Sequence, residues 1–93
     1  MIVRIATEDQ YRLPDDDAAR LNELDNEAVA AVDGGDEDRF HEVFEAMLQL
    51  VRRDGHRLGD DEIEESDVIL PPPDLSFVEA QQQFTGDGLI PEV

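Results

Sequence analysis

The chain has 93 residues, a length typical of one domain, and carries 25 acidic residues against seven arginines, with no lysine and no cysteine. Its net charge of −18 opposes contact with nucleic-acid phosphates and with anionic membrane surfaces. The missing cysteine and lysine exclude disulfides, thiolate metal sites, a P-loop and Schiff-base chemistry. We expect a single domain over residues 1–93 that is not an enzyme and needs no cofactor.

The excess of carboxylates, with arginine as the only strong cation, predicts a protein adapted to molar salt, as in the cytoplasm of a halophilic archaeon. Repulsion between the acids opposes folding in dilute buffer, whereas a Debye length of about 3 Å at 1 M salt screens it. Folding should therefore require high salt, which circular dichroism across a salt titration measures. No apolar run reaches the roughly 20 residues that span a bilayer, and the first residues lack a signal-peptide pattern. The expected location is cytoplasmic, without direct membrane insertion.

The first third of the chain predicts a β-hairpin followed by a helix. Residues 2–13 alternate between apolar and polar side chains around a polar turn at 7–9, which is typical of paired strands. Residues 15–33 are predicted as a helix, with Asp15 as its N-cap and Gly34 at its end. The apolar stripe of this helix consists of Leu21, Leu24, Ala28 and Val32.

A second helix is predicted over residues 37–53. Asp36 is the expected cap, Arg52 and Arg53 suit the negative end of the helix dipole, and Gly55 marks the end. The apolar residues follow the i, i+3, i+4, i+7 pattern and are Phe40, Val43, Phe44, Met47, Leu48 and Val51. Because a two-residue turn joins the two helices, they should form an antiparallel αα-hairpin.

The last third is predicted to be mostly irregular over residues 56–75, with a loop at 59–62. Val68–Leu70 is predicted as a short strand, and the prolines at 71–73 must be extended. Ser76 and Glu79 have the spacing of a capping box, which predicts a short helix over 77–84. Residues 89–91 should then fold back or pair with another segment.

Together these elements predict an α+β fold: an N-terminal β-hairpin, an antiparallel αα-hairpin, an extended proline-rich segment with a short strand, and a short C-terminal helix. The apolar positions of the predicted helices and hairpin should supply most of the core. The expected core residues are Tyr11, Leu21, Leu24, Val32, Phe40, Phe44, Met47, Leu48 and Val51.

No residue pattern predicts a catalytic or metal site. Paired acids occur throughout the chain, so their presence has no diagnostic value. Counting from Asp33 or from Asp60, the residues do not have the spacing of a calcium loop. His41 and His56 have no partner at the HxxxH spacing of zinc sites. Nucleophile candidates are limited to serines and threonines, of which Ser76 is already explained as a cap. We therefore assign no catalytic, cofactor or metal residues.

Two short apolar segments exceed what the predicted helices and hairpin require. They are Val68, Ile69 and Leu70 in the predicted strand, and Leu89 and Ile90 near the C-terminus. Each segment either completes the core or forms a surface offered to another protein, and the sequence leaves both possibilities open. An exposed strand edge of the hairpin is a further candidate surface. We take the five apolar residues as candidate partner-binding residues.

Four segments of the chain resemble PspAA, the small domain associated with phage-shock protein A. They are residues 1–5 with 10–12, residues 35–40, residues 66–72 with Asp74, and residues 85–91, in the same order and spacing as in the family. The resemblance implies a non-enzymatic adaptor or regulator of a phage-shock-protein-A homologue, a membrane-remodelling coiled-coil protein of the envelope-stress response. It implies no catalytic residues.

Two other classes remain as alternatives. An acidic metal- or small-ligand-binding protein, including a minor hydrolase, would need a pocket in which several acids converge. A DNA-binding helical regulator would need a basic surface, which the composition opposes.

Overall fold

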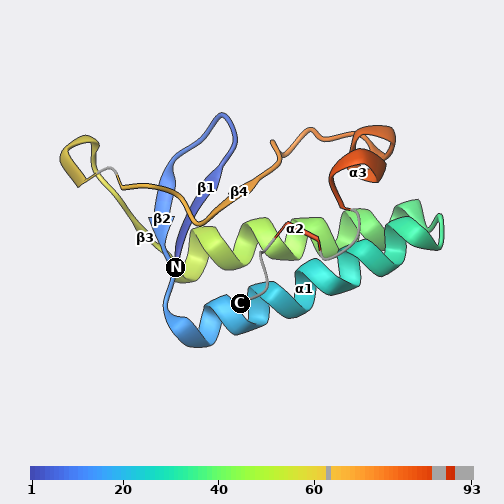
Figure 1. Ribbon diagram of the computed structural model, residues 1–93, viewed down its shortest axis with the longest axis horizontal. Coiled ribbons are helices and arrows are strands. Elements are labelled where there is room, and N and C mark those ends of the chain that lie inside the picture. Colours follow the sequence, from blue (N-terminus) through green and yellow to red (C-terminus); the bar gives the residue numbers. More distant parts are fainter. Residues whose placement is uncertain (63, 85–87, 90–93) are drawn as a thin grey trace.

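The computed structural model describes residues 1–62, 64–84 and 88–89, and it confirms the predicted α+β fold (Figure 1). The strands are β1 (Ile2–Ile5), β2 (Gln10–Arg12), β3 (His56–Arg57) and β4 (Val68–Leu70). The helices are α1 (Asp15–Asp33), α2 (Glu37–Asp54) and α3 (Phe77–Gln83), with one short 3-10 helix, η1 (Asp60–Glu62).

The strands form one sheet in the order β3-β2-β1-β4. The β1–β2 and β2–β3 pairs are antiparallel, whereas β4 lies parallel to β1, with Arg4 opposite Ile69. The prediction of a strand at Val68–Leu70 is confirmed. Residues 56–57 and 59–62 were predicted as irregular and loop, which is wrong for β3 and η1. A two-residue strand has no period, so it is defined only by its pairing with β2.

The start of α1 differs from the prediction, because the N-cap is Pro14 and Asp15 lies in the first turn. The proline ring holds φ at −60° in an extended conformation, and the carbonyl of Pro14 accepts from the Ala18 N–H at 2.9 Å. The first-turn acids still lie at the positive end of the helix dipole. The helix ends as predicted, with Gly34 as C-cap and Gly35 at φ +70°.

The predicted caps of α2 and the start of α3 are confirmed, and α2 is one residue longer than predicted. The Asp36 side chain accepts from the Arg39 N–H at 3.1 Å, and Gly55 is the C-cap of α2. At α3, both hydrogen bonds of the capping box between Ser76 and Glu79 are present. The N-caps Asp36 and Ser76 each accept from a backbone donor that a helix N-terminus leaves unpaired.

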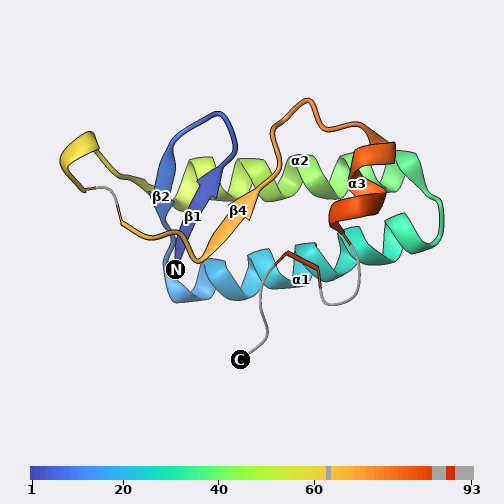
Figure 2. The ribbon, with the colours of Figure 1, turned by 45° about the horizontal axis from the view of Figure 1, so that its top comes forward.

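The sheet and α3 cover the same side of the α1–α2 pair, at opposite ends of it (Figures 1 and 2). Under α3, all four phenylalanines of the chain gather, with ring centroids of Phe40 and Phe84 5.2 Å apart and those of Phe40 and Phe44 5.6 Å apart. Such ring pairs add to the stabilisation from buried area. Of the nine predicted core residues, Tyr11 is half-buried against the core and the others are buried.

A buried carboxylate holds the chain that follows α3 against α1. Asp25 has no exposed area, and both of its carboxylate oxygens lie 3.0 Å from the donating N–H of Leu89. The predicted return of residues 89–91 is therefore seen at Leu89, whereas residues 90–91 lie outside the described residues. Gly88 is at φ +84°, and a Cβ on it would lie 2.5 Å from Asp25 Oδ2.

Candidate partner-binding surface

The two faces of the sheet differ in what they contact. Side chains alternate along β1 and β4, so that Val3, Ile5, Val68 and Leu70 are all buried, between 0% and 3% exposed. The opposite face, called here the outer face, carries Arg4 in a row with Gln10 on β2 and Ile69 on β4, as the strand register requires.

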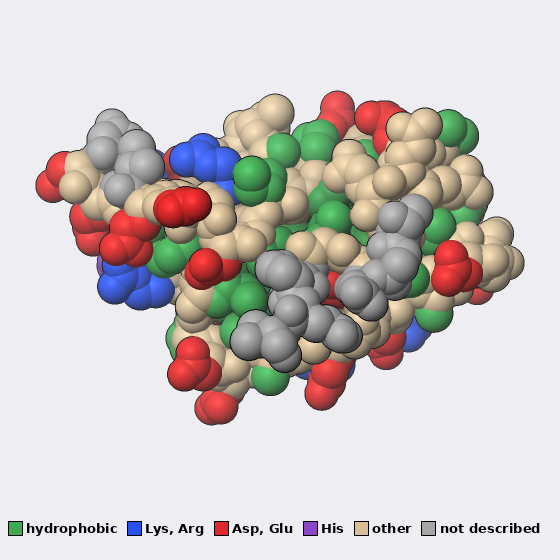
Figure 3. Space-filling view, in the orientation of Figure 1, with side chains coloured by type: hydrophobic (Ala, Val, Ile, Leu, Met, Phe, Trp, Pro, Cys, Tyr) green, Lys and Arg blue, Asp and Glu red, His purple; other side chains and the backbone are tan. Residues whose placement is uncertain are grey.

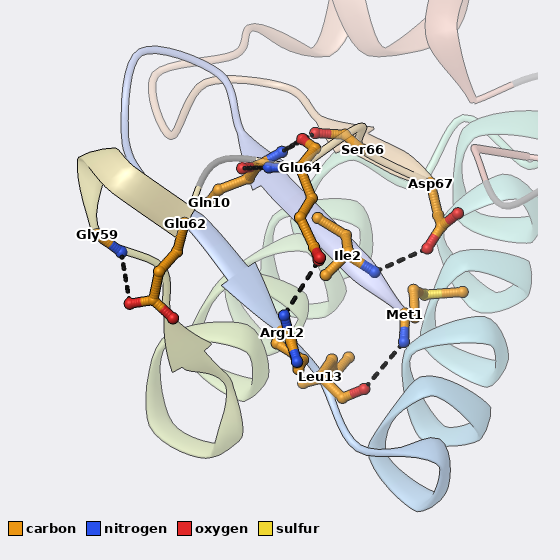
Figure 4. Close-up of polar contacts among 10 residues, drawn as sticks. All are labelled: Met1, Ile2, Gln10, Arg12, Leu13, Gly59, Glu62, Glu64, Ser66 and Asp67. Atoms are coloured by element: carbon orange, nitrogen blue, oxygen red, sulfur yellow. Dashed lines mark hydrogen bonds and ion pairs between the residues drawn. The ribbon is translucent and has the colours of Figure 1, made fainter.

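Residues 64–66 cover the β2 half of this outer face. Gln10 is 4% exposed, and its Nε2 donates to Ser66 Oγ at 2.7 Å and to the Glu64 carbonyl oxygen (Figure 4). Its Oε1 accepts from the Glu64 N–H at 3.2 Å. Because the buried amide is hydrogen-bonded at both ends, the covering segment is fixed over β2.

A second set of contacts extends this cover along the strands. Asp67 Oδ2 accepts from the Ile2 N–H at 2.8 Å, while the Asp67 N–H donates to the Ile2 carbonyl, so the chain enters β4 already paired with β1 (Figure 4). Arg12 adds an exposed ion pair to Glu64 at 3.1 Å. The β2 half is thus closed by contacts from within the chain.

The β4 half is open. Ile69 is 58% exposed, and β4 is an edge strand of only three residues. Val78 on α3, 67% exposed, is the other large exposed hydrophobic residue in the described part of the chain. In Figure 3, hydrophobic atoms are visible over the middle of the molecule, and most acidic side chains lie toward its rim. An unpaired strand edge can pair with another chain, and Ile69 adds an exposed apolar side chain to this edge.

The candidate partner-binding residues fall into different environments. Val68 and Leu70 are buried in the core, Ile69 points outward, and Leu89 is half-buried against the core. Ile90 lies outside the described residues. The hairpin edge is not available, because β1 and β2 are each paired on both sides. Among the described strands, β3 and β4 lie at the edges of the sheet.

Two residues of the outer face were missed by sequence reasoning, namely Gln10 and Arg4. The period of two in residues 2–5 does place Arg4 opposite Val3 and Ile5, so its face was available from the pattern. Nothing local marks Gln10 as buried, because its partners Glu64 and Ser66 lie more than 50 positions further along the chain.

Charged groups at the N-terminal end of α1 perturb one another. The pKa of Asp17 is raised, first because partial burial removes water from its carboxyl group and then because of the hydrogen bond and charge of Asp54. The pKa of Asp54 is lowered, chiefly by its hydrogen bond with Arg53. Both groups are solvent-accessible, and the arrangement has the character of a surface cluster.

Two residues of the types considered for chemistry have structural contacts. His41 lies edge-on to Phe40, with ring centroids 5.5 Å apart, and Ser66 serves the Gln10 contact. Within the described ranges, no group of three or more His, Asp or Glu side chains could hold a metal ion. Three surface hollows have volumes of about 220 to 440 Å³, and the largest brings only two acids, Asp15 and Asp54, near Arg12.

Comparison with known families confirms the family resemblance seen in the sequence. The chain matches the PspAA family model, described as PspA-associated protein, over residues 1–92. That description names an association and no catalysed reaction. Among curated proteins and among solved structures, no match is found. In the part of the chain that the structure describes, no helix has both the length and the apolar character needed to cross a membrane. The chain belongs to the PspA-associated protein family.

Proposed function

We propose that this protein is a non-enzymatic adaptor or regulator that binds a coiled-coil protein of the PspA type in the envelope-stress response. The family match supports the identity of the partner. The open β4 half of the outer face supports the contact site, and the observation that carries this placement is the exposure of Ile69 between two buried neighbours.

A helical partner fits this surface better than an added strand does. A strand added at β4 would gain few backbone hydrogen bonds, because β4 has only three residues. A helix laid across the outer face instead places an apolar side chain on Ile69. Residues 64–66 bound this site on the β2 side, so the partner is confined to the rows around β1 and β4.

The placement at Ile69 can be separated from general stickiness of exposed apolar residues. Val78 is a matched control, since it is also exposed and apolar but lies on α3. The experiment is calorimetric titration of the purified PspA-family protein of the same organism into wild type, Ile69→Glu and Val78→Glu, all in molar KCl. Circular dichroism establishes that each variant is folded.

Wild type is expected to bind, Ile69→Glu to bind at least 10-fold more weakly, and Val78→Glu to bind as wild type does. A folded wild-type protein that does not bind contradicts the proposed function. Equal losses in the two variants, or none in Ile69→Glu, contradict the placement at β4 and leave the partner assignment in place.

A further inference from the structure

Six of the seven arginines form ion pairs within the molecule, and Arg4 does not pair with any described residue. The paired side chains are Arg12 with Glu64, Arg20 with Glu23, Arg39 with Glu27 and Glu42, Arg52 with Glu8, Arg53 with Asp54, and Arg57 with Asp9. In a chain with 25 acids, an arginine that has no ion pair among the described residues is not explained by any shortage of carboxylates.

Arg4 lies at the boundary between the closed and open halves of the outer face. It is half-buried on β1, and its register partners are Gln10 on one side and Ile69 on the other. Gln10 uses its side-chain amide in the contacts to residues 64–66. The side chains in this row therefore offer Arg4 no carboxylate, and the row continues directly into the exposed isoleucine.

We propose that Arg4 is the cationic anchor of this docking surface and receives a carboxylate of the partner beside the apolar contact at Ile69. This inference rests on the proposed function and states its recognition chemistry. The partner segment carries an Asp or Glu side chain within one helical turn of an apolar residue. The planar guanidinium can hold both oxygens of that carboxylate, and an arginine beside an apolar contact is a common centre of binding energy.

The same chemistry is suited to high salt. At about 1 M salt, charges more than about 3 Å apart are largely screened, so the acidic surface of this protein would repel an acidic partner little. A direct two-oxygen contact at Arg4 lies within that distance and is sheltered by the apolar contact at Ile69. Binding through Arg4 should therefore persist as KCl is raised.

The test compares Arg4→Glu, Arg4→Gln and Arg4→Lys with the control Arg20→Glu, using the same PspA-family protein and molar KCl. Arg20 is an exposed arginine on α1, so the control makes the same charge change away from the sheet. Since Arg4 has no ion pair among the described residues, its variants should keep the urea midpoint of wild type. Arg4→Gln supplies the result if Arg4→Glu does not fold.

Arg4→Glu is expected to weaken binding at least 30-fold, Arg4→Gln and Arg4→Lys about 10-fold, and Arg20→Glu less than 2-fold. Reversing one acidic residue of the partner to arginine should restore binding to Arg4→Glu. If Arg4→Glu and Arg4→Gln bind as wild type does while Ile69→Glu still loses affinity, the anchor is refuted and the proposed function stands. If folded wild type does not bind, both fail.

Discussion

The two halves of the outer sheet face differ in how far the rest of the chain covers them. Over β2, residues 64–66 close on Gln10 and leave it 4% exposed. Over β4, a few residues later, Ile69 is left 58% exposed while both of its neighbours are buried. The polar Gln10 is buried and the apolar Ile69 is exposed, which is the reverse of what burial of apolar surface alone would produce. In the proposed function, the open half is the surface that contacts the partner, and the closed half is not available for it.

The largest expected effect comes from comparing two neighbouring residues of β4. Leu70→Ala should lower the free energy of unfolding by about 2–5 kcal/mol, because it removes buried methyl groups and leaves a cavity. Ile69→Ala should change it by less than about 0.5 kcal/mol, since the side chain already faces water. Urea unfolding at a fixed molar KCl concentration measures both. Similar losses of stability at the two positions would show that Ile69 is part of the core. They would contradict the claim that the β4 half of the outer face is open.

The closed half is tested at Gln10. Gln10→Ala should lower the free energy of unfolding by about 1–3 kcal/mol, because the Glu64 N–H loses its acceptor under the covering segment. The control Arg12→Ala breaks only the exposed ion pair to the same glutamate and should change it by about 0–1 kcal/mol. If both variants had equal small effects, the cover over β2 would be a loose loop.

The hydrogen bonds from the Leu89 N–H to the buried Asp25 carboxylate form a second buried contact, which can be compared with the contact at Gln10. Gly88→Ala should lower the free energy of unfolding by about 1–3 kcal/mol, because it combines an unfavourable positive φ with a steric clash against Asp25. Gly35→Ala has a similar φ of +70° and nothing within 4 Å of the new Cβ, so its loss should be smaller. The urea midpoints of the two variants measure this difference. An equal loss of stability would show that the clash with Asp25 contributes nothing.

The smallest expected effect concerns pH. The raised pKa of Asp17 favours folding below the unfolded value of about 3.9, and that contribution is lost as pH rises through the folded pKa. Asp17→Asn should therefore slightly raise the melting temperature at pH 7 and lose this advantage in acid.

The matched variant Asp54→Asn should have the opposite sign. The lowered pKa of Asp54 stabilises the fold above the unfolded value, and this is lost as pH falls through the folded pKa. Melting curves between pH 3 and 7 test the pair. A shift of the same sign for both variants at pH 7 would contradict the assigned environments.

Much of the fold follows from local signals. The period of 3.6 in α2, the cap at Asp36 and the capping box at Ser76 depend on residues within a few positions of one another, and each is confirmed. The N-cap of α1 was misassigned because an aspartate follows a proline, and proline already fixes the extended entry to the helix. Residue preferences for the N-cap position do not distinguish well between two such adjacent residues.

The candidate site depends on contacts that are distant in the sequence. The parallel pairing of β4 with β1 sets Ile69 beside Arg4 across 65 positions, and no pattern in a three-residue strand specifies that partner. The alternation inside β4 does predict that Ile69 faces away from Val68 and Leu70 once a strand is assumed. That Arg4 has no ion pair among the described residues becomes clear only once the pairs of the other six arginines are known.

Amide hydrogen exchange of this protein with and without its PspA-family partner in molar KCl tests the central claim most directly. The open half of the outer face should become protected, with slower exchange at Arg4 and across Val68–Leu70. The exposed face of α1 around Arg20 and α3 around Val78 should exchange at their free rates. Protection confined to α1 or α3, with β4 unchanged in the bound state, would contradict the account.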